Sequence, residues 1–162
     1  MPELIKPKIY LDTSVIGYLT SEPTRDLVTT SHQQTTREWW DKHRSIFDLY
    51  VSELVTQEAG RGDPGEARKR LDIVNLIQQE LKITDKATTL AQLFLKEKAL
   101  PKKSANDLFH IAIATVHNMD CIITWNFKHI ANVTMRKAML KVCKLQGYEL
   151  PIVCTPEELI GE

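Results

Sequence analysis

Short apolar runs recur along the chain, and segments with apolar residues at helical spacing separate them. The runs that predict β-strands lie at residues 9–11, 49–51, 121–124 and 152–154. Strands that alternate with helices favour right-handed crossovers, because a parallel neighbour can be reached only by crossing a face of the sheet. The pattern therefore predicts an α/β fold with a mainly parallel sheet.

The intervening segments predict helices, several of them with clear start or stop signals. Ser52 is a favourable N-cap, Pro64 stands in a first turn, and Gly60 ends a short helix. The polar segment 27–47 predicts one or two helices with a loop-like beginning. The other predicted helices cover about 13–19, 53–59, 64–77, 85–98, 104–118 and 134–146.

Length and composition are those of a globular protein. The 162 residues fit a single domain, 1–162, and the 43% apolar and 26% charged residues suit a chain that buries a core. No stretch approaches the roughly 18 uninterrupted apolar residues of a membrane span, and the start lacks the apolar region of a signal peptide. We therefore expect a cytoplasmic protein with no membrane segment.

The cysteines give no sign of a metal site or of disulfides. Cys121, Cys143 and Cys154 are odd in number, lie in apolar surroundings and lack the C-x-x-C or C-x-x-H spacing of zinc ligands. They are predicted to be reduced residues of the core.

Charge gives only local support for a nucleic-acid partner. The 21 basic and 21 acidic residues cancel. Between Cys121 and Tyr148, however, the chain has basic residues and no acidic one, so this stretch either attracts phosphates or forms an ordinary solvated helix face. Its basic residues are Lys128, Arg136, Lys137, Lys141 and Lys144.

Polar residues stand at the carboxyl ends of two predicted strands. Asp12 directly follows the strand at 9–11, and Asn126 follows the strand at 121–124 after one residue. Ligands of open parallel sheets collect at these ends, because loops and helix N-termini converge there. The two side chains are therefore predicted to face one crevice, although an aspartate before a helix is also ordinary N-cap chemistry.

Glu58 lies on the apolar side of its predicted helix, four residues after Leu54 and three after Val55. Burying an unpaired carboxylate is costly, so we expect Glu58 to be paired with a cation, hydrogen-bonded or bound to metal. Glu53 lies in the first turn of the same helix, where the helix dipole favours an exposed anion. Glu58 is therefore the preferred candidate of the two.

Asp107 begins a stripe that continues with Ile111 and Ala114, so it projects at the inward edge of a helix start. Ser104, three residues earlier, makes a capping box the alternative explanation. Neither Asp12 nor Asp107 therefore identifies a site by itself.

Taken together, these segments resemble the successive motifs of the PIN-domain family. The matching strings are KIYLDTS at 8–14, the Glu58 segment ending in glycine, ANDLFHIA at 105–112 and CIITWNF at 121–127. The resemblance extends from about Lys8 to Val153, and the order and spacing of the motifs carry it. It implies a three-layer α/β/α fold with a central sheet of four or five strands.

PIN domains are mostly Mg²⁺- or Mn²⁺-dependent ribonucleases, and many bacterial members are toxins of type II toxin-antitoxin pairs. The resemblance therefore implies hydrolysis of RNA phosphodiesters, an antitoxin protein as partner and a homodimer. It places the metal ligands at Asp12, Glu58 and Asp107, with Asn126 at a fourth position that is often aspartate. Asn126 can offer a carbonyl oxygen or hold a ligating water, but it adds no negative charge.

The polar residues next to these acids have a functional and a structural interpretation. The hydroxyls of Thr13, Ser14 and Thr124 could hydrogen-bond a carboxylate or a phosphate at the rim of the site, or cap a helix and pack in a strand. His110 and His117 are seven residues apart, which is not the i, i+4 spacing of a zinc pair. His110 is therefore interpreted as a packed helix residue.

Aromatic residues also have two interpretations. Trp125 and Phe127 could stack on bases, or one of them could anchor the core. Trp39 and Trp40 could cover the sheet or fill a subunit interface.

Two alternatives to a ribonuclease follow from the same residues. In the first, a PIN-fold module binds RNA or a protein partner without cutting, and Asn126 marks a weakened metal site. In the second, the chain is a phosphotransfer enzyme, since Asp12 resembles the strand-end aspartate of phosphatases. Those enzymes need a second aspartate two residues later, where Ser14 stands.

Overall fold

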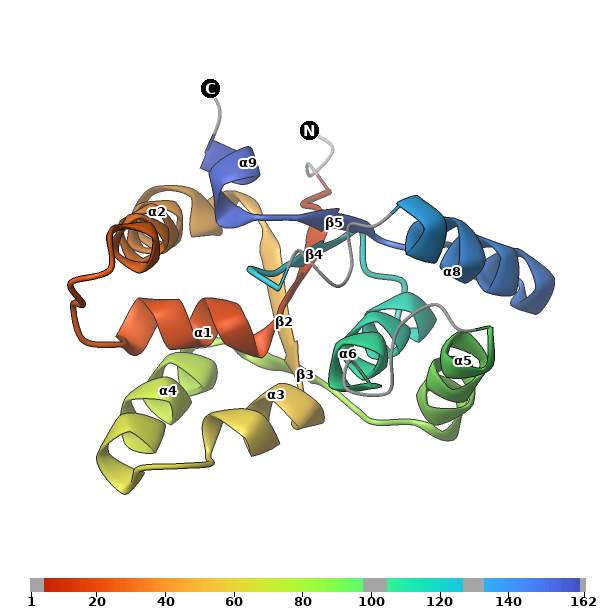
Figure 1. Ribbon diagram of the computed structural model, residues 1–162, viewed down its shortest axis with the longest axis horizontal. Coiled ribbons are helices and arrows are strands. Elements are labelled where there is room, and N and C mark those ends of the chain that lie inside the picture. The colour runs from red at the N-terminus through yellow and green to blue at the C-terminus, as the bar shows by residue number, and fades with distance from the viewer. Residues whose placement is uncertain (1–4, 98–104, 127–132, 161–162) are drawn as a thin grey trace.

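The computed structural model describes residues 5–97, 105–126 and 133–160. Within them, strands form a sheet in the order β3-β2-β1-β4-β5, with parallel pairing throughout (Figure 1). The strands are β1 (Lys8–Leu11), β2 (Asp48–Ser52), β3 (Gln79–Leu81), β4 (Cys121–Ile123) and β5 (Ile152–Cys154). The predicted parallel sheet of four or five strands is confirmed, with five.

Helices cover both faces of the sheet, which gives the expected α/β/α layers. In Figure 1, α1, α2 and α4 lie on one side of the strands and α5, α6 and α8 on the other. The helices are α1 (Thr13–Thr20), α2 (Leu27–His43), α3 (Glu53–Ala59), α4 (Pro64–Leu76), α5 (Asp85–Lys96), α6 (Ala105–Val116), α8 (Val133–Gln146) and α9 (Pro156–Ile160), with a 3₁₀ turn η1 (Arg44–Ile46) after α2. In the described part of the chain, none of them has the length and hydropathy needed to cross a bilayer.

The central strand β1 is buried by the helices on both faces. Ile9, Tyr10 and Leu11 are each at most 1% exposed, as expected for an inner strand of a covered parallel sheet. Asp12 follows at once and is the N-cap of α1, where its side chain accepts from the backbone N–H of Ser14. The core strand therefore delivers this carboxylate to the carboxyl edge of the sheet.

Two predicted helix starts are confirmed by their caps. The Ser52 side chain accepts a hydrogen bond from the backbone N–H of Val55 at the start of α3. Pro64 is the first residue of α4 and follows the N-cap Asp63. Because Ser52 also ends β2, the turn from β2 into α3 is tight, and it fixes where the first turns of α3 lie.

The prediction for the segment after residue 27 was wrong in one respect. Helix α2 is continuous from Leu27 to His43, without a loop-like beginning. Asp26 supplies the reason, because its carboxylate accepts from both the backbone N–H and the hydroxyl of Thr29. The predicted end of the 85–98 helix and the Ser104 cap lie outside the described residues.

Two elements were not predicted at all. Strand β3 has the sequence Gln-Glu-Leu and pairs with β2 at the edge of the sheet, so it is partly exposed and carries no apolar run. Helix α9 spans only five residues and packs against α2. Both are too short and too polar for a periodicity signal.

Two of the three tryptophans and the three cysteines lie in the core. Trp39 is fully buried and Trp40 is 7% exposed, so both rings pack inside the domain. Cys121, Cys143 and Cys154 are free and buried, and their burial confirms the predicted place in the core.

Candidate functional site

Asp12 is buried at the carboxyl end of β1, and its side chain is held by several donors. Its Oδ2 accepts from the hydroxyl of Ser14 at 2.6 Å, the hydroxyl of Thr124 at 2.9 Å and the amide Nδ2 of Asn126 at 3.4 Å. Asp12 is therefore an N-cap and also the centre of a polar cluster. The N-cap role is confirmed, and it does not prevent the carboxylate from contacting other polar side chains.

Glu58 reaches the same cluster from α3. Its side chain is 19% exposed, and Oε1 accepts from the hydroxyl of Thr13 at 2.9 Å and from Nε2 of His110 at 2.5 Å. Burial by itself raises the pKa of Glu58, but the hydrogen bond and charge of His110 and the hydrogen bond of Thr13 outweigh it, so the pKa is lowered. The lowered pKa favours the ionised form of Glu58, whose Oε1 faces Thr13 and His110.

His110 joins Glu58 to the interior of the fold. The ring is buried on α6, with Nδ1 2.5 Å from the hydroxyl of Tyr10, which in turn lies 2.8 Å from the hydroxyl of Ser52. Its Nε2 also lies 3.6 Å from Oδ1 of Asp12. Burial lowers the pKa of His110, but Glu58 and Asp12 raise it by more, so the net shift is upward.

The interpretation of His110 as a packing residue was therefore incomplete. The ring is buried, as expected, but it contacts Glu58 and approaches Asp12. The sequence did hold a signal. His110 follows Asp107 by three residues, which places both on one face of the helix.

Asp107 and Asn126 complete the cluster. Asp107 lies half-buried in the first turn of α6, and its Oδ1 accepts from Nδ2 of Asn126 at 3.3 Å. The same Nδ2 contacts Asp12, so one amide bridges the two carboxylates. The four predicted residues Asp12, Glu58, Asp107 and Asn126 are thus joined through side-chain contacts.

The sequence profile of the family described as "PIN domain" matches residues 9–132, more than half of the chain. This chain belongs to the PIN-domain family. A solved structure with a similar fold is VapBC2 from Rickettsia felis, bound to a DNA fragment from their promoter. The likeness has a TM-score of 0.58 at 13% identity and covers 91% of this chain and 98% of the matched one. No curated protein shows significant similarity to the sequence.

The donor set of this PIN domain fits a hard divalent cation, since carboxylate and amide oxygens are what Mg²⁺ and Mn²⁺ prefer. In the described residues, however, no group of three acids, histidines or cysteines is close enough to hold an ion. Instead, Nε2 of His110 lies between Glu58 and Asp12, and Nδ2 of Asn126 lies between Asp12 and Asp107. Nitrogen donors thus occupy the gaps between the carboxylates.

The predicted rim hydroxyls all contact site carboxylates in the structure. Thr13 donates to Glu58, and Ser14 and Thr124 donate to Asp12. Glu53 instead has a structural contact, because its Oε1 accepts a hydrogen bond from the backbone N–H of Ile83 at 2.8 Å.

Trp125, next to Asn126 in the sequence, packs against α2. The indole N–H of Trp125 donates to the hydroxyl of Thr36 at 2.8 Å, and the ring stacks on His32 with centroids 4.0 Å apart. This is the anchoring role, which ties β4 to α2. Phe127, the other aromatic candidate, lies outside the described residues.

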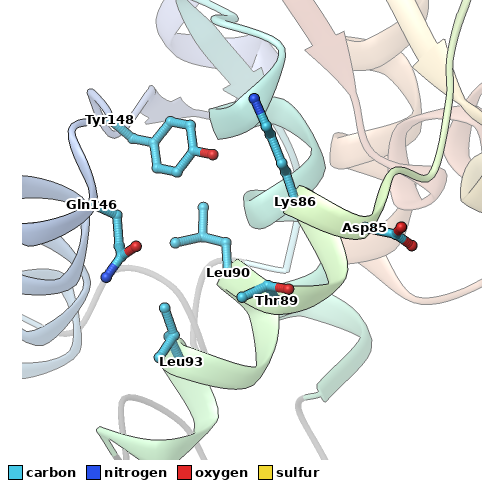
Figure 2. Close-up of a pocket in the computed structure, with 7 residues that line it drawn as sticks. All are labelled: Asp85, Lys86, Thr89, Leu90, Leu93, Gln146 and Tyr148. Carbon is cyan, nitrogen blue, oxygen red and sulfur yellow. The ribbon is translucent and has the colours of Figure 1, made fainter.

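A pocket of about 240 Å³ lies away from this cluster, between α5 and α8 (Figure 2). Leu90 and Leu93 form its apolar side, and Tyr148, Gln146 and Lys86 face it. None of the predicted site residues lines it. The candidate site is therefore the carboxylate cluster and not this pocket.

Proposed function

We propose that this PIN domain is a divalent-metal-dependent ribonuclease and the toxin of a type II toxin-antitoxin pair. The observation that carries the proposal is the convergence of Asp12, Glu58 and Asp107, from three different elements, around the nitrogen donors of His110 and Asn126. Family membership supports the nuclease class. The proposal places the protein in the cytoplasm, where its RNA substrate is found.

Electrostatics favours a cation at this cluster. Two unit charges ~4 Å apart repel by about 1 kcal/mol in water and about 4 kcal/mol at an effective dielectric of 20. Three partly buried carboxylates therefore gain from a bound divalent ion, which is stronger compensation than one imidazole and one neutral amide can supply.

In the proposed mechanism, Asp12 and Asp107 would hold the ion, and Glu58 would be a further ligand or orient the attacking water. When bound, a divalent metal would supply a lowered pKa for water and stabilisation of charge on the phosphate. Thr13, Ser14 and Thr124 fix the carboxylates in orientation by the hydrogen bonds described above. The expected products carry 5′-phosphate and 3′-hydroxyl ends.

Helix α8 offers a surface for the RNA backbone. Lys137, Lys141 and Lys144 lie on its exposed face at i, i+4, i+7 spacing, and no acidic residue occurs in the helix. Lys141 has one acidic neighbour, Glu97 of α5, at 3.8 Å between exposed side chains. A stripe of three lysines attracts phosphates, and the attraction weakens as salt is added.

The VapBC2 likeness also supports a protein partner. By this analogy we infer that a small antitoxin binds the chain, and that the toxin forms a homodimer. Co-purification with the product of a neighbouring small gene, followed by loss of nuclease activity in the complex, would support this part of the proposal. An isolated gene with no such neighbour would remove the toxin label without affecting the nuclease.

A second function is favoured by one specific observation. Asn126 supplies an amide where a fourth carboxylate would add charge, and it already bridges Asp12 and Asp107. In this alternative, the domain binds RNA or a protein without cutting. Salt-sensitive RNA binding with no cleavage in any divalent metal would favour it.

The experiment that separates the two compares single-stranded and hairpin RNA with Mg²⁺, Mn²⁺ or EDTA, using the wild type and Asp12→Asn. We expect cleavage only by the wild type and only with metal. Cleavage that persists in EDTA or in Asp12→Asn would contradict the metal-dependent nuclease.

A further inference from the structure

His110 is buried inside the fold, and its ring lies between the carboxylates of Glu58 and Asp12. Both of its ring nitrogens are engaged: Nδ1 with the Tyr10 hydroxyl and Nε2 with Oε1 of Glu58. A carboxylate can only accept, so Nε2 carries the proton of that hydrogen bond. The ring is therefore fixed at both ends.

The anchor behind His110 is part of the core. Tyr10 is a fully buried residue of the central strand, and its hydroxyl also contacts Ser52, the N-cap of α3. Burial raises the pKa of Tyr10, so the phenol stays neutral and keeps its proton for this chain of hydrogen bonds. The position of the imidazole is thus set by β1 and by the start of the helix that carries Glu58.

Glu58 depends on this anchor more than Asp12 does. Asp12 Oδ2 has donors on Ser14, Thr124 and Asn126, whereas Glu58 has Thr13 and His110. Both donors to Glu58 use Oε1, so in the described part of the chain Oε2 receives no hydrogen bond. Oε2 of Glu58 can therefore accept a cation or a water bound to it.

We propose that His110 is a positioning residue, which holds Glu58 through Oε1 and so fixes the orientation in which this carboxylate can serve a divalent cation. The inference rests on the proposed metal site and goes beyond it, because it assigns the geometry of Glu58 to the Tyr10–His110 pair. Without the imidazole, the hydrogen bond that Glu58 keeps within the described residues is the one from the Thr13 hydroxyl. The carboxylate would then move away from Asp12, whose charge repels it. Groups that orient a ligand in this way commonly change metal affinity 10- to 100-fold when removed.

Calorimetric titration of the intact chain with Mn²⁺ tests the assignment without any need for RNA cleavage. His110→Leu removes the Nε2 donor, and His110→Gln restores an N–H donor at nearly the same place. We expect Mn²⁺ affinity to fall about 10-fold or more in the leucine variant and to recover to within a few-fold in the glutamine variant. His117→Leu is the matched control. His117 follows His110 by seven residues, but among the described residues its ring contacts only the carbonyl of Lys82, at 2.9 Å.

A kinetic measurement separates positioning from direct catalysis. The Mn²⁺ concentration for half-maximal RNA cleavage should rise in His110→Leu, while kcat at saturating Mn²⁺ stays within a few-fold of the wild type. If His110→Leu does not fold, Tyr10→Phe replaces it, since it removes only the hydroxyl that holds Nδ1 and should weaken Mn²⁺ binding in the same direction.

Each outcome decides the assignment. Wild-type Mn²⁺ affinity in a folded His110→Leu or Tyr10→Phe variant, or failure of a folded His110→Gln to recover, overturns it. Mn²⁺ binding that behaves as expected while the wild type cleaves no RNA supports His110 as a positioning residue and removes the ribonuclease. A wild type that binds no Mn²⁺ overturns both.

Discussion

The amide Nδ2 of Asn126 lies 3.3 Å from Oδ1 of Asp107, at the fourth position of the proposed metal site. It also lies 3.4 Å from Oδ2 of Asp12. One neutral donor therefore relieves the repulsion between two carboxylates that approach from β1 and α6. We therefore expect the charge of residue 126 to affect two quantities: the unfolding free energy of the metal-free protein and its affinity for metal.

Replacing Asn126 with aspartate should shift that balance. Without metal, a fourth carboxylate replaces the donor, so the unfolding free energy should fall by about 1 kcal/mol, a modest value because Asn126 is exposed. With Mn²⁺, the added charge should tighten binding and raise cleavage. Urea unfolding with and without Mn²⁺ measures both, and Asn75→Asp on the exposed face of α4 is the control. Equal stability loss with and without metal would argue against a cation at this position.

Thr124→Val tests the hydrogen bond that orients Asp12. Valine keeps the shape of this buried residue but removes the donor to Oδ2, so we expect a loss of roughly 1–3 kcal/mol in stability and several-fold weaker Mn²⁺ binding. Thr115→Val is matched to it, because Thr115 is also buried and, among the residues that the structure describes, its hydroxyl donates to the backbone carbonyl of Ile111 alone. The control should lose stability without losing Mn²⁺ affinity. Equal Mn²⁺ binding by both variants would remove Thr124 from the site.

The stability of the metal-free protein should depend on pH in two separate windows. Burial lowers the pKa of His110, but Glu58 and Asp12 raise it by more, so the pKa lies above its usual 6.5. A raised pKa contributes stability that is fully present below pH 6.5 and is lost as pH rises through the folded value. The pKa of Glu58 is lowered from 4.5, so its contribution is present above pH 4.5 and is lost as pH falls through the folded value.

The combined contribution of Glu58 and His110 to the urea midpoint of the metal-free wild type should therefore be highest between about pH 4.5 and 6.5. The decline above pH 6.5 should be absent in His110→Gln, which cannot titrate. Asp107 and Tyr10 also face this ring or its partners, so Tyr10→Phe serves as a second check on the upper limb. An unchanged upper limb in His110→Gln would show that another group causes it.

The lysines of α8 should affect RNA binding and not chemistry. In the triple variant Lys137→Gln, Lys141→Gln and Lys144→Gln, KM for RNA should rise and kcat should stay unchanged. The slope of log affinity against log salt should fall by up to about 2, at roughly 0.7 per lost phosphate contact on single strands. Neutralising the exposed Arg25, Lys42 and Arg68 in the same way is the control for net charge. Equal effects of the two triple variants would mean that α8 has no special role.

The sequence predicts most of the fold because the elements that build the sheet are continuous apolar runs. Ile9 to Leu11 and Cys121 to Ile123 are buried strands that pair with each other, and their carboxyl ends carry Asp12 and Asn126. The helical phase of Glu58 likewise identifies a half-buried acid, and the structure brings its carboxylate to the hydroxyl of Thr13. Patterns that depend on burial of one face are therefore readable from the sequence.

The parts that were missed depend on contacts between distant residues. Strand β3 is polar because it lies at an edge, and only its pairing with β2 makes it a strand. His110 was assigned to packing because nothing in the local sequence shows that Tyr10, a hundred residues away, holds its ring toward Glu58. Such a network exists only after the sheet and α6 have come together.

The most direct test of the metal site is a crystal of the wild-type protein soaked in Mn²⁺, with the ion located by its anomalous scattering. The account predicts an ion ligated by oxygens of Asp12 and Asp107, with Glu58 bound directly or through water and Asn126 withdrawn from between the two aspartates. An ion bound elsewhere, or no ion at this cluster at millimolar Mn²⁺, would contradict it.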